Sequence, residues 1–168
     1  MIYGQGVISN FARFVNDGTL VAELGPLEVQ APLGNWNSAT GTLTGGTYIA
    51  NSGALGLDSL GSETITNLVG ANVGITANTL GEGILTGNGT VNALGGLANV
   101  SHSSIALGQS EFGLEAAIPL TIAPAGGTLN VASSALSINF GADVTVNGNL
   151  IQDAASQIGA ALLPAGSE

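Results

Sequence analysis

The sequence predicts an all-β fold, and within that class a parallel β-helix, or β-solenoid, of about six or seven coils with roughly 20-odd residues each. Three observations lead to this prediction. Glycine fills 27 of the 168 positions and recurs throughout, which disfavours long helices. Short β-branched and apolar runs lie between the glycines and alternate with polar residues. Related phrases also recur, such as Gly-Thr-Leu at 18–20, 41–43 and 127–129.

The expected strands follow one another with only short gaps between them. Within them, alternation such as Leu136-Ser137-Ile138 places one side of each strand toward a core. Residues 150–163 alone also carry a helical apolar stripe, so a helix or cap within 150–168 stays open. In chain order the expected strands are 6–15, 18–25, 25–31, 41–50, 63–69, 72–77, 83–87, 89–94, 103–108, 127–132, 135–148 and 149–152.

An antiparallel β-sandwich is the alternative fold. Asp17-Gly18, Asn88-Gly89 and Asn147-Gly148 each lie between expected strands, and such dipeptides are strong hairpin signals. However, the strands are short, numerous and closely spaced. The corners of a parallel β-helix also need Asn and Gly in left-handed conformations, so these dipeptides suit either fold.

Composition excludes several classes of function. The chain has one Lys or Arg against 11 acidic residues, a formal net charge of -10, so we expect no binding to nucleic acid. Anionic membrane surfaces are disfavoured for the same reason, and no apolar run is long enough for membrane insertion. With no cysteine there is no thiol nucleophile and no disulfide. The residues at the start, MIYGQGVISNF, do not read as a secretion signal.

Acidic residues are thinly spaced. Glu28, Asp58, Glu82, Glu111 and Asp143 could supply about one carboxylate per coil, on outward-facing turns. Carboxylates stacked between coils could bind Ca²⁺ weakly, although the sequence contains no calcium-loop motif. We therefore expect no dedicated cofactor or metal site.

Catalytic groups are scarce. Arg13 is the only side-chain cation, and we expect it at the surface, paired with Asp17 or Glu23. His102 lies beside serines, but neighbours on a strand point to opposite faces and no nucleophile-elbow motif is present. The chain is thus not expected to be an enzyme, and a polysaccharide-acting enzyme is the less favoured alternative.

Threonines suggest a ligand face. Thr-x-Thr pairs, with their hydroxyls on one side of a strand, could form a flat surface for a carbohydrate or for ice. Trp36 lies in a turn-rich patch, where we expect it to pack a loop. The candidate face comprises Thr40, Thr42, Thr44, Thr64 and Thr66.

Several phrases resemble a known family. GVISNFARFVNDGTLVAE (6–23), SATGTLTGGTYIANSGALGL (38–57), ILTGNGTVNAL (84–94) and VTVNGNLIQDAASQIG (144–159) are similar to repeats of autotransporter-like and filamentous-haemagglutinin-like bacterial surface proteins. The resemblance implies a right-handed β-helix, secreted or at the cell surface, that serves as a structural or adhesin-type scaffold. It also implies that residues 1–168 form one domain, a module or fragment of a larger protein.

We expect the partner to be further copies of the same chain. A solenoid ends in unpaired strand edges, and unpaired edges template further pairing. Homo-oligomers or filaments formed through the ends or faces are therefore predicted. A glycan or another surface ligand is a second candidate partner.

Overall fold

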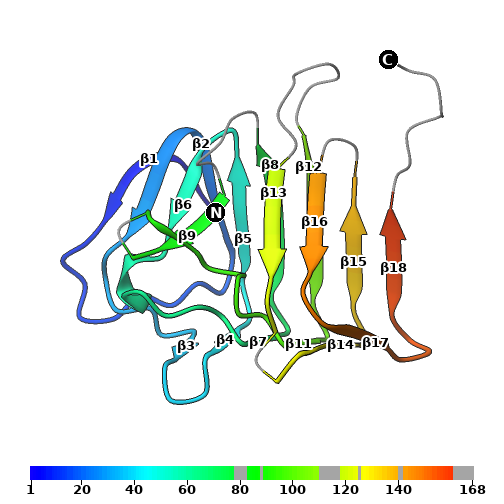
Figure 1. The fold of residues 1–168 in the computed structure, drawn as a ribbon. Coiled ribbons are helices and arrows are strands. Elements are labelled where there is room, and N and C mark those ends of the chain that lie inside the picture. The colour runs from blue at the N-terminus through cyan, green and yellow to red at the C-terminus, as the bar shows by residue number, and fades with distance from the viewer. Residues whose placement is uncertain (78–82, 88, 110–117, 125, 140–141, 161–168) are drawn as a thin grey trace.

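The computed structural model describes residues 1–77, 83–87, 89–109, 118–124, 126–139 and 142–160. These residues form strands and one short 3-10 helix (Figure 1). None of the described residues belongs to a helix with the length and apolar character that crossing a membrane requires. The elements are β1 (Ile2–Ile8), β2 (Thr19–Val29), β3 (Trp36–Asn37), β4 (Thr42–Thr44), β5 (Thr47–Asn51), β6 (Ala54–Gly56), η1 (Asp58–Leu60), β7 (Asn67–Val69), β8 (Asn72–Ala77), β9 (Gly83–Thr86), β10 (Val91–Asn92), β11 (Asn99–Ser101), β12 (Ser104–Gln109), β13 (Ile118–Ile122), β14 (Thr128–Ala132), β15 (Ala135–Ile138), β16 (Ala142–Val146), β17 (Asn149–Gln152) and β18 (Gln157–Ala160).

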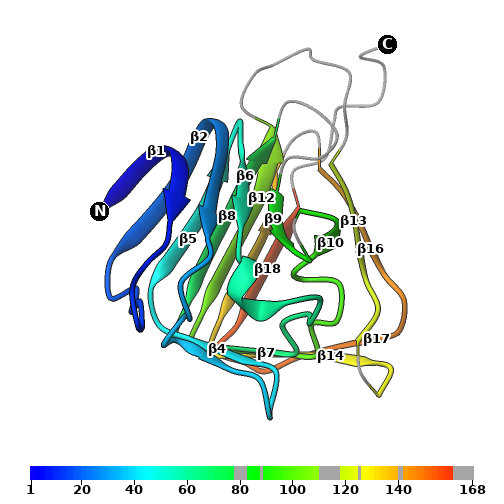
Figure 2. The ribbon, with the colours of Figure 1, turned by 90° about the vertical axis from the view of Figure 1, so that its left-hand side faces the viewer.

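The strands form three sheets. A ten-stranded sheet runs β10-β9-β6-β2-β5-β8-β12-β15-β18, with β1 also paired to β2, and a six-stranded sheet runs β17-β14-β11-β7-β4-β3. β13 and β16 form the third sheet. Strand pairs are parallel except β3–β4 and β9–β10. The ten-stranded sheet is strongly curled (Figure 2). The all-β, mostly parallel prediction is thus confirmed, and the antiparallel sandwich is wrong.

The chain turns the same corner repeatedly. A strand of the six-stranded sheet is followed within a few residues by a strand of the ten-stranded sheet, in the pairs β4–β5, β7–β8, β11–β12, β14–β15 and β17–β18. We call each such pair a level. Residues stacked on consecutive levels are separated by 25, 32, 31 and 22 residues at this corner, as in Thr47–Asn72, Asn72–Ser104, Ser103–Ser134 and Ser134–Ser156. The middle levels are therefore longer than the 20-odd residues expected.

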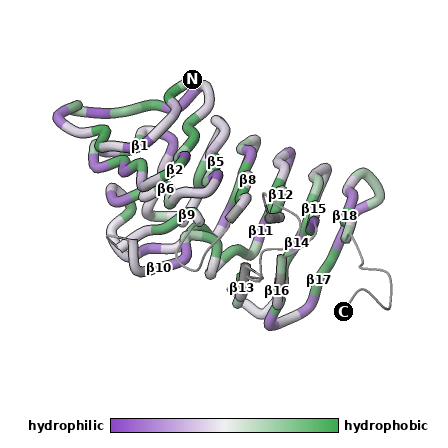
Figure 3. Tube along the Cα trace, turned by 90° about the horizontal axis from the view of Figure 1, so that it is seen from above, coloured by the Kyte–Doolittle hydropathy of each residue, from purple (hydrophilic) through white to green (hydrophobic). Residues whose placement is uncertain are grey.

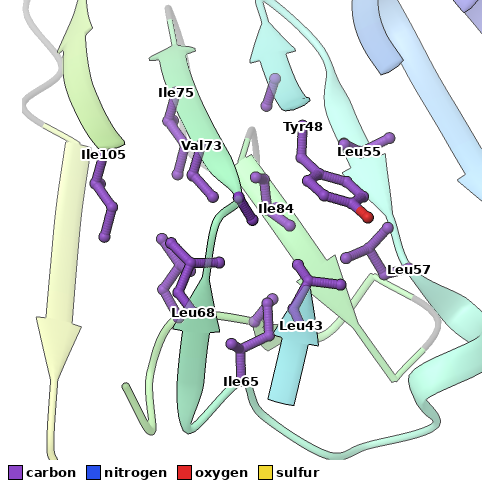
Figure 4. Close-up of a cluster of buried hydrophobic side chains, with 14 of the residues drawn as sticks. Leu43, Tyr48, Leu55, Leu57, Ile65, Leu68, Val73, Ile75, Ile84 and Ile105 are labelled. Atoms are coloured by element: carbon purple, nitrogen blue, oxygen red, sulfur yellow. The ribbon is translucent and has the colours of Figure 1, made fainter. Parts of the chain in front are cut away.

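Inward-facing apolar side chains stack in columns. Parallel register places Leu20, Tyr48, Val73, Ile105 and Leu136 directly above one another, all buried. A facing column from the six-stranded sheet closes the core between them (Figure 4). Burying one such large side chain stabilises the fold by about 1.5–3 kcal/mol. The facing column is Leu43, Leu68, Val100 and Val131.

Tyr48 brings a phenol into this core. Its side chain is fully buried, and its hydroxyl has no hydrogen-bond partner among the described residues. Burial raises the pKa of Tyr48 to about 12, an effect that Asn16 opposes and the charge of Asp17 increases. The Asn16 amide lies near and bonds Thr47 O (3.1 Å) and the N–H of Gly18 (3.2 Å), but it makes no hydrogen bond of acceptable geometry to the phenol. The phenol oxygen is therefore a buried polar atom without compensation.

The repeated corner has its own pattern. On successive levels one residue adopts a left-handed conformation, and the residue after it is small and leads into the ten-stranded sheet. Glycine adopts this conformation without steric cost, whereas other residues are strained there. The left-handed positions are Gly45 (φ 62), Gly70 (φ 61), His102 (φ 50) and Ser133 (φ 49).

A chain of serines links the later corners. The Ser103 hydroxyl accepts from the N–H of Ala71 at 3.2 Å, and the Ser134 hydroxyl accepts from the N–H of Ser103 at 3.1 Å. The Ser156 hydroxyl accepts from the N–H of Ser134 at 3.2 Å. All three serines are buried, so these bonds satisfy backbone groups that water cannot reach. The serines join one level to the next.

Some local predictions need correction. Asn147-Gly148 does not close a hairpin, because β16 pairs with β13 and β17 pairs with β14. Asp17-Gly18 leads into β2. Asn88 itself lies outside the described residues, but β9 and β10, on either side of Asn88-Gly89, pair antiparallel as that dipeptide predicts. Residues 149–152 and 157–160 are strands, so the helix allowed for 150–163 does not form there. Parallel pairing with β14 and β15 overrides the local helical stripe.

Candidate functional site

A shallow depression rich in hydroxyl groups lies between two consecutive levels. Its volume is about 510 Å³, and it is open to solvent. Two segments supply its walls, one leading into β4 and the other into β7. The lining residues are Ser38, Ala39, Thr40, Gly41, Ser62, Glu63, Thr64 and Thr66.

Gly41 holds the two walls together. Its carbonyl accepts from the N–H groups of Thr66 (2.8 Å) and Asn67 (2.9 Å). Its φ is +60°, and a Cβ placed there would come within 2.7 Å of Thr66 Oγ1. This close approach and the left-handed backbone both require glycine, which fixes Thr66 beside the first wall.

The five predicted threonines separate into two groups. Thr40, Thr64 and Thr66 line the depression, so the structure brings together residues 24 and 26 positions apart. Thr42 and Thr44 lie on β4, where their parallel partners are Asn67 and Val69. The threonines therefore do not stack as the single flat ladder that an ice-binding surface would use.

Hydrogen bonds further divide the threonine hydroxyls. Thr40 Oγ1 and Thr42 Oγ1 share a hydrogen bond of 2.7 Å at the rim of the depression. Thr44 instead donates to the carbonyl of Asn35 at 3.1 Å. Hydroxyls both donate and accept, and the depression adds the Glu63 carboxylate as an acceptor. This set of groups can both donate to and accept from a polar ligand.

An asparagine ladder adjoins the depression, at positions that the sequence analysis did not single out. Asn67 Nδ2 donates to Thr40 O at 2.7 Å, Asn99 Nδ2 donates to Asn67 Oδ1 at 2.7 Å, and Asn130 Nδ2 donates to Asn99 Oδ1 at 3.0 Å. Asn67 and Asn99 open β7 and β11, and Asn130 is the third residue of β14, in the phrases Asn-Leu-Val, Asn-Val-Ser and Asn-Val-Ala. Those phrases, 32 and 31 residues apart, were the available signal.

Two carboxylates meet elsewhere in the fold. Glu28 and Asp58 flank Gly56 and line a small cavity of about 50 Å³. Burial raises the pKa of Asp58, and the nearby charge of Glu28 raises it further. Glu28 also accepts a hydrogen bond from Gln30 Nε2 at 3.0 Å. Two of the spaced acids thus lie near each other, Glu28 on β2 and Asp58 on η1.

Metal ligands do not gather in the described part of the chain. No group of three His, Cys, Asp or Glu side chains lies close enough there to hold an ion. Glu82 and Glu111 are outside the described residues, as is the side chain of Asp143. Weak Ca²⁺ binding stays a prediction.

His102 and Arg13, the two residues considered as catalytic groups from the sequence, both lie at the surface. His102 is exposed at its left-handed corner, and its Nδ1 shares a 2.9 Å hydrogen bond with Ser101 Oγ. The expected opposite orientation of neighbours does not apply, because β11 ends at Ser101. Arg13 is exposed and donates from Nη2 to Gly34 O at 3.0 Å, rather than to Asp17 or Glu23.

The Asp153 carboxylate accepts several hydrogen bonds from within the fold. It accepts from the N–H groups of Ser133 (3.1 and 3.0 Å) and Ala155 (3.1 Å) and from Ser156 Oγ (2.5 Å). The Ser156 hydroxyl, followed by the Ser133 N–H, lowers the pKa of Asp153. The carboxylate therefore stabilises the last corner of the stack.

Among the described residues, Trp36, Tyr48 and Tyr3 do not form a sugar-stacking platform. Trp36 is half-buried on β3, paired with Leu43 and packed against the core. Tyr48 is buried, while Tyr3 is exposed on β1 at one end of the stack.

No family model, no curated protein and no solved structure matches the chain.

Proposed function

We propose that the chain is a right-handed parallel β-helix that serves as a secreted or cell-surface structural scaffold of adhesin type, without catalytic activity. One observation carries the proposal: the same inward and corner positions are stacked in parallel register on level after level. In such stacks, each repeat is stabilised mainly by its two neighbours, which suits an elongated support.

The polar positions support this function. The asparagine ladder and the serine chain use side chains to join levels rather than to form a reactive cluster. A single Lys or Arg in 168 residues leaves trypsin-type proteases almost no cleavage site, which suits persistence outside a cell. The sequence resemblance to autotransporter-like and filamentous-haemagglutinin-like repeats supports the same setting.

Particle shape and activity together test the scaffold. Negative-stain electron microscopy of the purified chain should show rods, and sedimentation velocity should show self-association that increases with concentration. Assays on acidic and neutral polysaccharides should show no released sugar ends. Round particles, or sustained turnover of a polysaccharide, would refute the proposal.

Carbohydrate binding is a second candidate function, and the hydroxyl-lined depression favours it. Thr66→Val removes one hydroxyl while nearly preserving shape, so it should weaken binding to an immobilised glycan panel. Thr121→Val is the matched control, since Thr121 is exposed on β13, outside the depression. Equal binding by wild type and both variants, or none by wild type, would remove this candidate.

A further inference from the structure

The two ends of the stack present different strand edges. β1 pairs only with β2, and β18 pairs only with β15, so each has one unpaired side in the described structure (Figure 3). In the six-stranded sheet, β3 instead lies antiparallel against β4 and covers its outer edge. The β1 end of the stack can therefore accept another parallel strand in the ten-stranded sheet but not beside β4.

The edge strands continue the columns of the core. Ile2 stands above Leu20 and Ile158 stands below Leu136, at opposite ends of the main inward column. The interior members of this column are buried, whereas Ile2 is 40% exposed and Ile158 is half-buried. A second inward column likewise begins at Gly4 and ends at Ala160. Within the described part of the chain, both columns stop at apolar side chains or glycine without a covering level.

Exposed apolar side chains gather at the same two ends. Ten large hydrophobic side chains are exposed among the described residues. Six of them lie within residues 1–15, and two, Leu150 and Ile151, lie on β17 of the last level. Apolar surface concentrated in this way marks a contact surface more often than single exposed residues do.

Charge distinguishes the ends and favours a second copy as the partner. Arg13, the one Lys or Arg side chain in a chain of net charge -10, lies in the segment between β1 and β2, which also carries Asp17. The last level exposes the Asp153 carboxylate. A contact between unlike ends brings the end that carries Arg13 toward the end that carries Asp153.

We infer that copies of this chain join head to tail, with β18 of one copy adding in parallel to β1 of the next. This inference rests on the self-association in the proposed function and specifies its surface and polarity. Continuing the register places Ile158 beside Ile2, Gly159 beside Tyr3 and Ala160 beside Gly4. A joint between unlike surfaces does not close on itself, so it produces a filament.

Tyr3 and Gly159 form the most specific part of the joint. Tyr3 is 61% exposed, and a Cβ added at Gly159 would meet no atom within 4 Å. The tyrosine ring can therefore lie over the open glycine, an arrangement known to compensate for glycine in a strand pair. The two positions belong to one outward column that also contains Ala106 in the middle of the stack.

Lysine substitutions at the two ends test the inference. Tyr3→Lys and Gly159→Lys place a charge on opposite edges at exposed positions, and lysine on an edge strand blocks pairing. In sedimentation velocity each variant alone should lose the assembly shown by wild type. An equal mixture should give a one-to-one dimer, because one wild-type joint can still form. Ala106→Lys is the control and should assemble like wild type.

The outcomes separate this inference from the proposed function. If wild type assembles and either end variant still does, or if the mixture stays monomeric, the head-to-tail joint is wrong while self-association stands. Loss of assembly in Ala106→Lys would place the contact on the lateral face and also overturn the joint. A wild type that stays monomeric at all concentrations would overturn the self-association itself.

Discussion

The amide of Asn99 donates from Nδ2 to Asn67 Oδ1 at 2.7 Å across 32 residues of sequence. Asn99 Oδ1 in turn accepts from Asn130 Nδ2 at 3.0 Å. Each amide thus donates toward the preceding level and accepts from the following one, as parallel in-register strands allow. The ladder contributes polar cohesion on the outside of the sheet, parallel to the apolar columns within.

Asn99→Ala removes two rungs of this ladder at once. The net contribution of a hydrogen bond is about 0.5–1.5 kcal/mol, so the free energy of unfolding should fall by about 1–2 kcal/mol. Chemical denaturation measures the change. Asn149→Ala is the control, since Asn149 is exposed and its side chain makes no hydrogen bond in the described structure. Equal effects of both substitutions would show that the ladder adds nothing.

Tyr48→Phe removes the buried hydroxyl that has no partner. An unsatisfied buried polar group costs about 1–3 kcal/mol, so this variant should be more stable than wild type by roughly 1 kcal/mol. Tyr3→Phe, at an exposed position, should leave stability unchanged. A thermal melt compares the three proteins. Destabilisation by Tyr48→Phe would mean that the hydroxyl does have a partner in solution.

The Tyr48 pKa also predicts an alkaline loss of stability. Its folded pKa of about 12 lies above the ordinary tyrosine pKa of 10.0, so the protonated phenol favours the folded state. The contribution is complete below the unfolded pKa and is lost as pH rises through the folded pKa. Wild type should therefore lose more stability than Tyr48→Phe as pH rises from 10 to 12. Parallel pH curves for the two proteins would argue against this burial.

Two corner glycines differ in the space around them. A Cβ at Gly46 would come within 2.5 Å of the carbonyl oxygen of Asn16, whereas a Cβ at Gly70 would meet nothing within 4 Å. Both have left-handed φ values. Gly70→Ala should cost about 1–2 kcal/mol of backbone strain, and Gly46→Ala should cost distinctly more because a backbone must also move. The reverse order in denaturation would contradict the packing at this corner.

Asp153 and Asp58 predict pH effects of opposite sign. The pKa of Asp153 is lowered by its hydrogen bonds, so its carboxylate adds stability above the unfolded pKa, which is lost as pH falls through the folded pKa. Asp153→Asn should therefore be less stable than wild type at pH 7, and the difference should shrink on acidification. Urea denaturation at several pH values measures it.

Asp58 is expected to act in the other direction. Its pKa is raised, so its carboxylate opposes folding once pH exceeds the folded pKa. Asp58→Asn should match or exceed wild-type stability at pH 7 and converge with it below the unfolded pKa. The effect is small because Asp58 is largely solvated. A marked loss of stability at pH 7 would mean that the charged Asp58 is stabilising.

Local pattern was sufficient for many strands. The alternation in 72–77 predicts β8 with the observed bounds, and 127–132 differs from β14 by one residue. Alternation failed where a non-local partner decides the structure. The stripe in 150–163 is compatible with a helix, but Gln157–Ala160 pairs with Ala135–Ile138 to form β18. The sequence of 150–163 by itself carries no information about that partner strand.

The candidate site could be predicted only in part, for the same reason. The Thr-x-Thr spacing identified Thr40, Thr64 and Thr66. However, a constant repeat of about 22 residues would place Thr64 beside Thr42 and Thr66 beside Thr44, which is not the observed register. The actual register sets Thr42 opposite Asn67, three residues beyond Thr64. Levels of unequal length shift the register by amounts that depend on η1 and the loops.

Cysteine pairing in this cysteine-free chain tests the parallel register most directly. Val69 and Ser101 are parallel partners, and adjacent strands lie about 4.8 Å apart, within the range of about 4.4–6.8 Å between the Cα atoms of a disulfide. Under mild oxidation, V69C/S101C should form an intramolecular disulfide in high yield. V69C/N99C, offset by two residues, should remain reduced. Efficient cross-linking of the offset pair, or none of the aligned pair, would contradict the stacked parallel fold.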